Sequence, residues 1–124
     1  MAARRKTIAI DFDGTINSYV SGFVAIDEIP DLPVPGAFEF IERAVLVFDR
    51  VCIFSTRNTS SRGCAAMVRW FRLHGMREVV IAQLQFPLTK PRASVFIDDR
   101  AIKFNGDWSE FDPMKLVDFK PWWK

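Results

Sequence analysis

Short apolar runs alternate with helical patterns over residues 7–84, and another apolar run follows at 93–98. This order constrains the fold more than any other feature. The runs are short and rich in β-branched residues, which is typical of strands that are buried on both faces. Four of them occur, TIAIDF (7–12), RVCIFS (50–55), EVVIAQL (78–84) and ASVFID (93–98). Strands and helices in this order predict an open, mostly parallel α/β sheet.

Two helices are predicted between these strands. The segment 33–48 opens with Pro and Gly and then places apolar residues at helical spacing, from Ala37 through Ile41 to Phe48. This spacing predicts a helix with one apolar face. A second helix is expected to start within NTSS (58–61), which offers several N-caps, and to run to His74. Gly75 is expected to end it.

Length and composition indicate a single domain that spans residues 1–124 and is large enough to bury a core. The apolar fraction is 49% and the formal net charge is only +2, which is too small to indicate nucleic-acid binding by itself. No apolar run approaches the roughly 18–20 residues of a membrane span. The basic N-terminus lacks the apolar stretch of a signal peptide. Cys52 and Cys64 lack metal-site spacing and are interpreted as reduced thiols of a cytoplasmic protein.

Polar residues follow three of the four predicted strands. The first strand leads into Asp11, Asp13 and Gly14, the second into residues 55–58, and the fourth into Asp98 and Asp99. Ligands of open parallel sheets bind at the carboxyl ends of the strands. We therefore expect these residues, with Lys90 just before the fourth strand, to meet at one edge of the sheet.

Each of these pieces also has a purely structural interpretation. Asp13-Gly14 between apolar runs is a hairpin signal, and Ser55-Thr56 would suit a loop with a helix cap. Lys90 before a proline would suit a surface turn. The Asp98-Asp99 pair is harder to explain in this way, because adjacent carboxylates repel unless a cation holds them. The four pieces together favour a functional site.

Phosphoryl transfer needs the residue types that gather here. Asp11 and Asp13 are two residues apart, so both side chains can face one site. Gly14 allows a tight turn that brings backbone N–H groups to an anion. The Ser55 hydroxyl and the Lys90 charge suit a phosphate. Asp98, with Asp11, offers the oxygen ligands that magnesium prefers, which makes Mg²⁺ the expected cofactor.

The motifs DFDGT (11–15), the strand that ends at Ser55, Lys90-Pro91 and Asp98-Asp99 resemble, in this order, the four motifs of the haloacid dehalogenase (HAD) superfamily of phosphohydrolases. The resemblance covers residues 7 to about 100. It implies a three-layer, Rossmann-like fold with helices on both faces of the sheet. It also implies a magnesium-dependent phosphatase that forms an aspartyl-phosphate.

The resemblance assigns the catalytic roles as follows. Asp11 is the nucleophile and a metal ligand. Asp13 protonates the leaving oxygen and then deprotonates water, while its backbone carbonyl contacts the metal. Lys90 neutralises the charges of nucleophile and phosphate. Asp98 binds magnesium directly, and Asp99 binds it through water or orients its neighbours.

The resemblance also places residues around the phosphate. Ser55 is expected to bind it through its hydroxyl, with Thr56 as the alternative donor, and the Gly14 backbone is expected to contribute an N–H group. Thr15 and Arg57 complete the expected substrate-binding set.

The intervals of 40 positions from Thr15 to Ser55 and of 35 from Ser55 to Lys90 leave no room for the cap domain of larger relatives. An open site suits a macromolecular end, or a substrate covered by a neighbouring subunit of a homo-oligomer. The chain is similar to the phosphatase domain of polynucleotide kinases, capless relatives that act on 3′-phosphate ends. The expected partner is a phosphorylated small molecule or a nucleic-acid end. No membrane partner is expected.

Two further features leave alternatives open. Basic residues flank the expected site and suit either a polyanionic substrate or a solvated surface; they are Arg57, Arg62, Arg92, Arg100 and Lys103. Trp108, Trp122 and Trp123 could stack on bases, or pack the C-terminal segment onto the core or a subunit interface. The main alternative function is a phosphate- or nucleic-acid-binding module without turnover. A DxD transferase is disfavoured because the chain is too short for a sugar-nucleotide domain.

Overall fold

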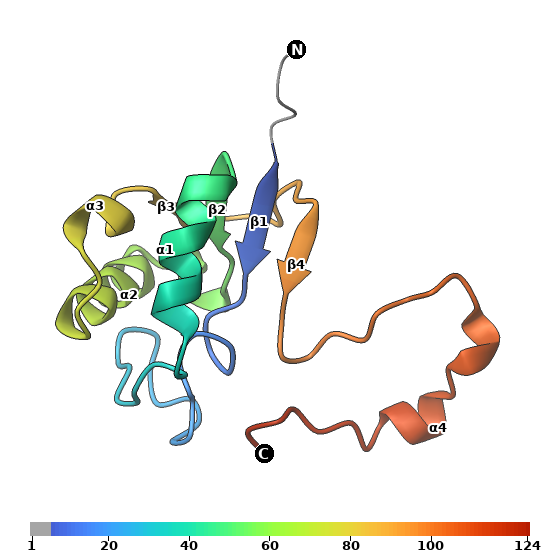
Figure 1. The fold of residues 1–124 in the computed structure, drawn as a ribbon. Coiled ribbons are helices and arrows are strands. Elements are labelled where there is room, and N and C mark those ends of the chain that lie inside the picture. Colours follow the sequence, from blue (N-terminus) through green and yellow to red (C-terminus); the bar gives the residue numbers. More distant parts are fainter. Residues whose placement is uncertain (1–5) are drawn as a thin grey trace, which may run out of the picture.

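A computed structural model describes residues 6–124 and contains one parallel sheet of four strands. The strands are β1 (Thr7–Ile10), β2 (Arg50–Ile53), β3 (Leu84–Gln85) and β4 (Val95–Ile97). Their order across the sheet is β3-β2-β1-β4, and every pairing is parallel (Figure 1). The prediction of an α/β fold with an open, mostly parallel sheet is confirmed.

The connections from β1 to β2 and from β2 to β3 are helical. They contain α1 (Ala37–Val47), the 3₁₀ turn η1 (Thr56–Thr59), α2 (Ser61–Leu73) and α3 (Glu78–Ile81). Ser60 caps α2, because its hydroxyl oxygen accepts hydrogen bonds from the N–H groups of Arg62 and Gly63. The α2 helix ends one residue before His74, close to the predicted end.

The strand predicted over residues 78–84 is wrong in its first part. Residues Glu78–Ile81 form the helix α3, and only Leu84–Gln85 pair with β2. Val80 and Ile81 are both buried while Val79 is exposed, a pattern that one turn of helix satisfies and an alternating strand does not. A short apolar run does not distinguish these two structures from sequence.

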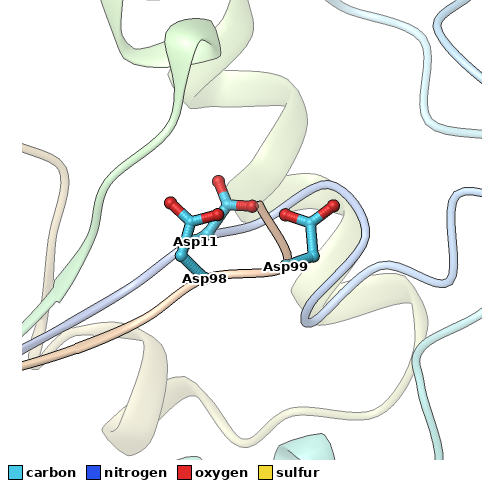
Figure 2. Close-up of side chains that lie close together, drawn as sticks. All are labelled: Asp11, Asp98 and Asp99. Atoms are coloured by element: carbon cyan, nitrogen blue, oxygen red, sulfur yellow. The ribbon is translucent and has the colours of Figure 1, made fainter. Parts of the chain in front are cut away.

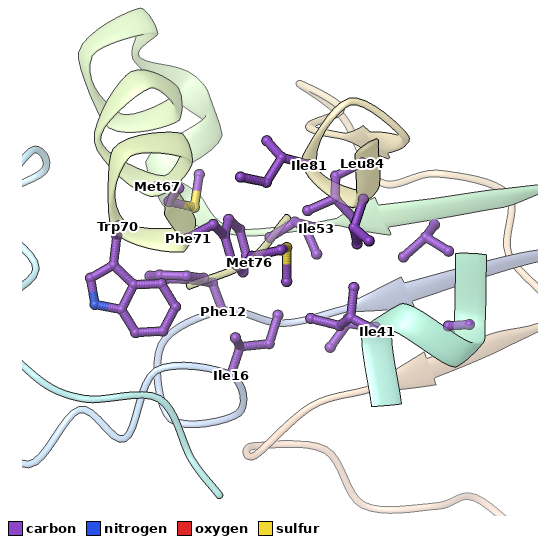
Figure 3. Close-up of a cluster of buried hydrophobic side chains, with 14 of the residues drawn as sticks. Phe12, Ile16, Ile41, Ile53, Met67, Trp70, Phe71, Met76, Ile81 and Leu84 are labelled. Carbon is purple, nitrogen blue, oxygen red and sulfur yellow. The ribbon is translucent and has the colours of Figure 1, made fainter. Parts of the chain in front are cut away.

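One hydrophobic core lies between the helices and one face of the sheet. Ile8 pairs with Val51 and Ile10 pairs with Ile53, so these four side chains share a face. Side chains of α1, α2 and α3 pack against them (Figure 3). They include Ile41, Ala44, Met67, Trp70, Phe71, Val80 and Ile81.

The expectation of helices on both faces is therefore corrected. The steps from β1 to β2 and from β2 to β3 run in the same direction, so right-handed connections place all three helices on one face. Residues 86–94 connect β3 to β4 at the opposite edge without a helix. The Lys90 ammonium of this connection lies 5.0 Å from the ring centroid of Phe96, on the second face.

Two further segments lie outside the strands and the helices α1 to α3. Residues 16–32 form a flap that follows β1, and residues 104–121 form an arm after β4. The arm contains a 3₁₀ turn, η2 (Trp108–Glu110), and a short helix, α4 (Pro113–Leu116). Figure 1 shows the arm leaving the core and the chain end returning toward it. Among residues 6–124, no helix combines the length and apolarity needed to cross a bilayer.

Candidate active site

Three carboxylates converge at the carboxyl ends of the neighbouring strands β1 and β4. Asp11 follows β1, and its backbone N–H donates to the carbonyl of Ile97 at 2.9 Å, which fixes it beside the end of β4. One carboxylate oxygen from each of Asp11, Asp98 and Asp99 lies within 4.8 Å of the others (Figure 2). The structure thus brings together the three aspartates that the sequence places at these strand ends.

The proximity of these carboxylates changes their acidity. Burial, together with a hydrogen bond to Asp99 and the negative charges of Asp98 and Asp99, raises the pKa of Asp11 from 3.8 to about 8. Burial also acts to raise the pKa of Asp99, but hydrogen bonds from Asp11 and from the Trp123 indole outweigh it and lower that pKa. In the metal-free chain, burial and the neighbouring carboxylates therefore favour the protonated form of Asp11.

This donor set fits a hard divalent cation. It consists of carboxylate oxygens, and magnesium takes one or two carboxylates together with water and phosphate oxygens. A cation at this position would relieve the repulsion that raises the pKa of Asp11. Asp13 is not a member of the three-carboxylate group.

Asp13 is held by two side chains beside this group. Arg57 Nε donates to its Oδ2 at 2.9 Å, and Asn17 Nδ2 donates to its Oδ1 at 3.0 Å. Both carboxylate oxygens of Asp13 therefore accept hydrogen bonds from fixed donors. The side chain keeps 16% of its surface exposed, so water and a substrate can reach it.

Arg57 connects Asp13 to the flap rather than facing the solvent. Its Nη1 donates to the carbonyls of Ala25 at 2.7 Å and Ile26 at 2.8 Å, and its side chain is 1% exposed. The guanidinium also lies 5.4 Å from the ring centroid of Phe23. Arg57 was predicted to bind substrate, but its guanidinium instead binds Asp13 and the flap and holds both in position.

A cleft of about 250 Å³ opens beside the carboxylates. Its lining residues are Asp11, Asp13, Tyr19, Phe23, Ser55, Thr56, Asp98, Asp99 and Arg100. A second hollow of about 290 Å³ shares Asp11, Asp98 and both hydroxyl residues with it. Ser55 Oγ accepts a hydrogen bond from the Arg57 N–H at 3.2 Å, which leaves its own proton free to donate. Ser55 and Thr56 both line the cleft, so either hydroxyl can meet a phosphate.

Gly14 and Thr15 belong to the turn below the cleft rather than to its lining. The Gly14 N–H donates to the Asn17 carbonyl at 2.8 Å, and the Thr15 N–H donates to the Phe12 carbonyl at 3.2 Å. Thr15 Oγ1 lies 3.4 Å from Asp11 Oδ2. In this structure the Gly14 N–H group predicted to bind phosphate is used to close the turn around Asn17.

Of the four predicted catalytic residues, Lys90 is the one that the structure does not bring to the cleft. Its side chain is exposed on the second face, against Phe96. The cationic side chain that lines the cleft is Arg100, whose Nε lies 3.9 Å from Asp99 Oδ2.

Trp122 and Trp123, near the C-terminus, contact the site. Their role could not be decided from the sequence. Trp123 Nε1 donates to Asp99 Oδ2 at 2.6 Å, and Trp122 Nε1 donates to the Gly14 carbonyl at 2.7 Å. The Trp123 ring packs edge-on against Tyr19 and lies 5.4 Å from the Arg100 guanidinium. Trp122 and Trp123 thus contact the turn and a carboxylate of the site in their own chain, while Trp122 keeps 63% of its surface exposed.

Sequence reasoning missed the roles of Asn17, Tyr19 and Phe23. Asn17 lies four residues after Asp13 in the turn, a spacing at which an amide can reach back to the carboxylate. Tyr19 and Phe23 belong to a flap without periodicity, so no sequence pattern places them at the cleft.

No protein-family model, curated protein or solved structure matches this chain.

Proposed function

We propose that this protein is a magnesium-dependent phosphomonoester hydrolase of the HAD type, without a cap domain. The observation that carries the proposal is the convergence of Asp11, Asp98 and Asp99 beside Asp13 in one cleft. Asp11 and Asp13 differ in surroundings, because Asp11 faces two carboxylates while Asp13 faces a guanidinium and an amide. This difference suits Asp11 as the nucleophile and Asp13 as the proton carrier.

In the first step, an Asp11 oxygen attacks phosphorus and the bond from phosphorus to the leaving oxygen breaks. The leaving oxygen takes a proton from Asp13 and departs as an alcohol, and Asp11 becomes an aspartyl-phosphate. In the second step, water attacks phosphorus and gives a proton to Asp13. Phosphate leaves and the Asp11 carboxylate is regenerated. The contacts from Arg57 and Asn17 keep Asp13 at one position through both steps.

Asp11, Asp98 and Asp99 would hold the magnesium ion, with the Asp13 backbone carbonyl as a further ligand. The ion would neutralise the charge that develops on the transferred phosphoryl group. Ser55 or Thr56 donates a hydroxyl hydrogen bond to a phosphate oxygen. Arg100 supplies positive charge at the rim of the cleft, where the resemblance leads us to expect Lys90.

The walls of the cleft favour a substrate with an aromatic base. Phe23 lines the cleft and is 59% exposed, and Tyr19 stands beside it. Exposed aromatic rings next to a phosphate site can stack on a nucleobase. We propose a nucleotide or a phosphorylated nucleic-acid end as the substrate class, in a cytoplasmic protein whose Cys52 and Cys64 are free thiols.

The test is phosphate release from a panel of phosphomonoesters, with and without Mg²⁺. The panel contains sugar phosphates, nucleotides and oligonucleotides with 3′- or 5′-phosphate ends. We expect Mg²⁺-dependent release that Asp11→Asn abolishes. Asp49→Asn is the matched control, because Asp49 is exposed at the opposite end of β2 and is expected to leave the rate unchanged. Release without Mg²⁺, or from Asp11→Asn at the wild-type rate, would reject the mechanism.

The position of Lys90 favours one alternative, a phosphate- or nucleic-acid-binding module without turnover. Its ammonium is outside the cleft, so the cation expected next to the nucleophile is missing among the lining residues. This alternative predicts that phosphorylated oligonucleotides bind, that their affinity falls in Arg100→Ala, and that no panel member is hydrolysed.

A further inference from the structure

The edge strand β4 lacks the cover that parallel strands normally have. Strands of parallel sheets are buried on both faces, and Ile8, Ala9 and Ile10 of β1 follow this rule. In β4, Val95, Phe96 and Ile97 are 42%, 43% and 37% exposed. A hollow of about 700 Å³ runs along this strand and reaches Ala101, Ile102 and Lys103. An apolar surface is therefore open at this edge of the sheet.

The arm, residues 104–121, carries a second open apolar surface. Phe104, Trp108 and Phe111 form an aromatic cluster, with ring centroids 4.7 to 6.0 Å apart, and Trp108 is 76% exposed. In and after α4, Met114 is 78% exposed and Val117 is 76% exposed. Figure 1 shows this arm away from β4 rather than folded over it.

The chain exposes more surface than a compact protein of its size. Its accessible surface is 8556 Å², whereas a compact monomer of 14.3 kDa exposes roughly 6,800 Å². After roughly 850 Å², an upper bound for five residues, is set aside for residues 1–5, which the structure does not describe, an excess of roughly 900 Å² remains. A specific interface of standard size needs about 800 Å² from each partner. The excess is therefore sufficient for a stable dimer.

The two open surfaces also carry complementary charge. The arm segment 107–112, DWSEFD, contains three acidic residues and no basic residue. The basic residues Lys90 and Arg92 precede β4, and Lys103 follows it. Opposite charges at the edges of an apolar contact select the partner and fix its orientation.

We propose that this protein is a homodimer in which the arm of each chain packs on the β4 surface of the other. The two surfaces belong to the same chain, so one two-fold axis covers both at once, and each copy both gives and receives an arm. The arm is anchored at both ends near Asp99, since it leaves the core after β4 and its end returns through Trp122 and Trp123. The partner's arm then supplies the layer that is missing at β4.

The first test is the mass of the full chain in solution, by sedimentation equilibrium or light scattering at micromolar concentration. We expect twice the 14.3 kDa of one chain. A monomer at every concentration would overturn the proposal, whether its arm stays extended or packs on its own β4 surface, and small-angle scattering would tell these two cases apart.

Two variants test which surfaces meet. Met114→Glu changes the arm, and Ile102→Glu changes the hollow along β4; both side chains are exposed within one chain, so neither change is expected to unfold it. Each is expected to raise the dimer dissociation constant at least tenfold. The control is Val79→Glu, an exposed residue of α3 near the opposite edge of the sheet, which is expected to remain dimeric.

Mixing the two variants distinguishes arm exchange from other dimers. A heterodimer of Met114→Glu with Ile102→Glu keeps one unaltered contact, from the arm of the second to the β4 surface of the first. We expect the mixture to form more dimer than either variant alone. Dimers that resist both changes, or a mixture with no more dimer than its components, would overturn the arm exchange.

Discussion

The Trp123 indole donates its N–H to the Asp99 carboxylate at 2.6 Å, across 24 positions of sequence. The contact joins the end of the chain to a carboxylate of the candidate metal site, whose side chain is 3% exposed. Groups that orient metal ligands tune the affinity of the site for its ion. The C-terminal residues are thus part of the architecture of the cleft.

We predict that Trp123→Phe weakens magnesium binding by roughly 10- to 100-fold, the usual effect of losing a group that orients a metal ligand. The phenyl ring keeps the contact with Tyr19 and removes only the N–H donor. The measurement is the Mg²⁺ concentration for half-maximal activity. Trp108→Phe, in the arm, is the matched control, and equal shifts in the two variants would contradict the role of Trp123.

Gly14→Ala is predicted to displace the C-terminal tryptophans. An added Cβ would lie 2.4 Å from Asp99 Oδ2 and 2.5 Å from Trp123 Nε1, in a residue with φ +83°. Gly22→Ala is the control, because it has a similar φ of +70° with nothing within 4 Å of the added atom. Both variants carry the backbone strain, and only Gly14→Ala is expected to change tryptophan fluorescence and to reduce activity. An unchanged spectrum in Gly14→Ala would show that the tail is not docked at this turn.

Removing Arg57 is predicted to destabilise the fold more than removing any exposed arginine. Arg57→Met leaves Asp13 without its cation and the carbonyls of Ala25 and Ile26 without their donor. Breaking a buried ion pair costs about 3–5 kcal/mol. Urea unfolding measures this cost. Arg62→Met, which breaks an exposed pair with Asp27, is expected to change the free energy of unfolding little. Equal losses in the two variants would contradict the structural role of Arg57.

The metal-free protein is predicted to lose stability as the pH rises through the range in which Asp11 ionises. The pKa of Asp11 is 3.8 in the unfolded reference and about 8 in the folded chain, so the folded state holds the extra proton between these values. The contribution of Asp11 to the free energy of unfolding is fully present below about pH 4. It is lost as the pH rises through about 8.

Thermal unfolding in EDTA at about pH 5 and about pH 8 measures this loss. Asp11→Asn is expected to reduce the difference in Tm between the two conditions. Mg²⁺ is expected to raise the Tm of the wild type at the higher pH and to have little effect on Asp11→Asn. A wild-type Tm that does not depend on Mg²⁺ at the higher pH would argue against the metal site.

The parts of this molecule that sequence predicts well are those governed by local pattern and strand topology. The parallel sheet follows from the alternating segments, and the meeting of Asp11 with Asp98 follows from the adjacency of β1 and β4. The α3 helix was not predictable, since the burial of both Val80 and Ile81 is decided by packing against the core.

Other features depend on tertiary contacts that no local pattern encodes. The connection 86–94 carries Lys90 to the second face of the sheet, because β3 and β4 lie at opposite edges. Trp123 reaches Asp99 only after the arm has left the core and returned. The sequence therefore predicts the carboxylates of the site but not the groups that hold them.

Asp13→Asn is predicted to slow turnover by roughly 10²- to 10⁴-fold, the usual value of general acid–base catalysis. The variant loses the group that takes a proton from water, so the phosphorylated enzyme should accumulate when the leaving group departs without help. A substrate with a good leaving group, such as an aryl phosphate, is suited to this experiment.

The most direct test of the proposed chemistry is to quench Asp13→Asn with acid during turnover of a labelled aryl phosphate and to locate the label by peptide mapping. The account predicts Mg²⁺-dependent phosphorylation of the peptide that contains Asp11, and its absence in the double variant with Asp11→Asn. A label on another residue, or continued phosphate release from Asp11→Asn, would contradict it.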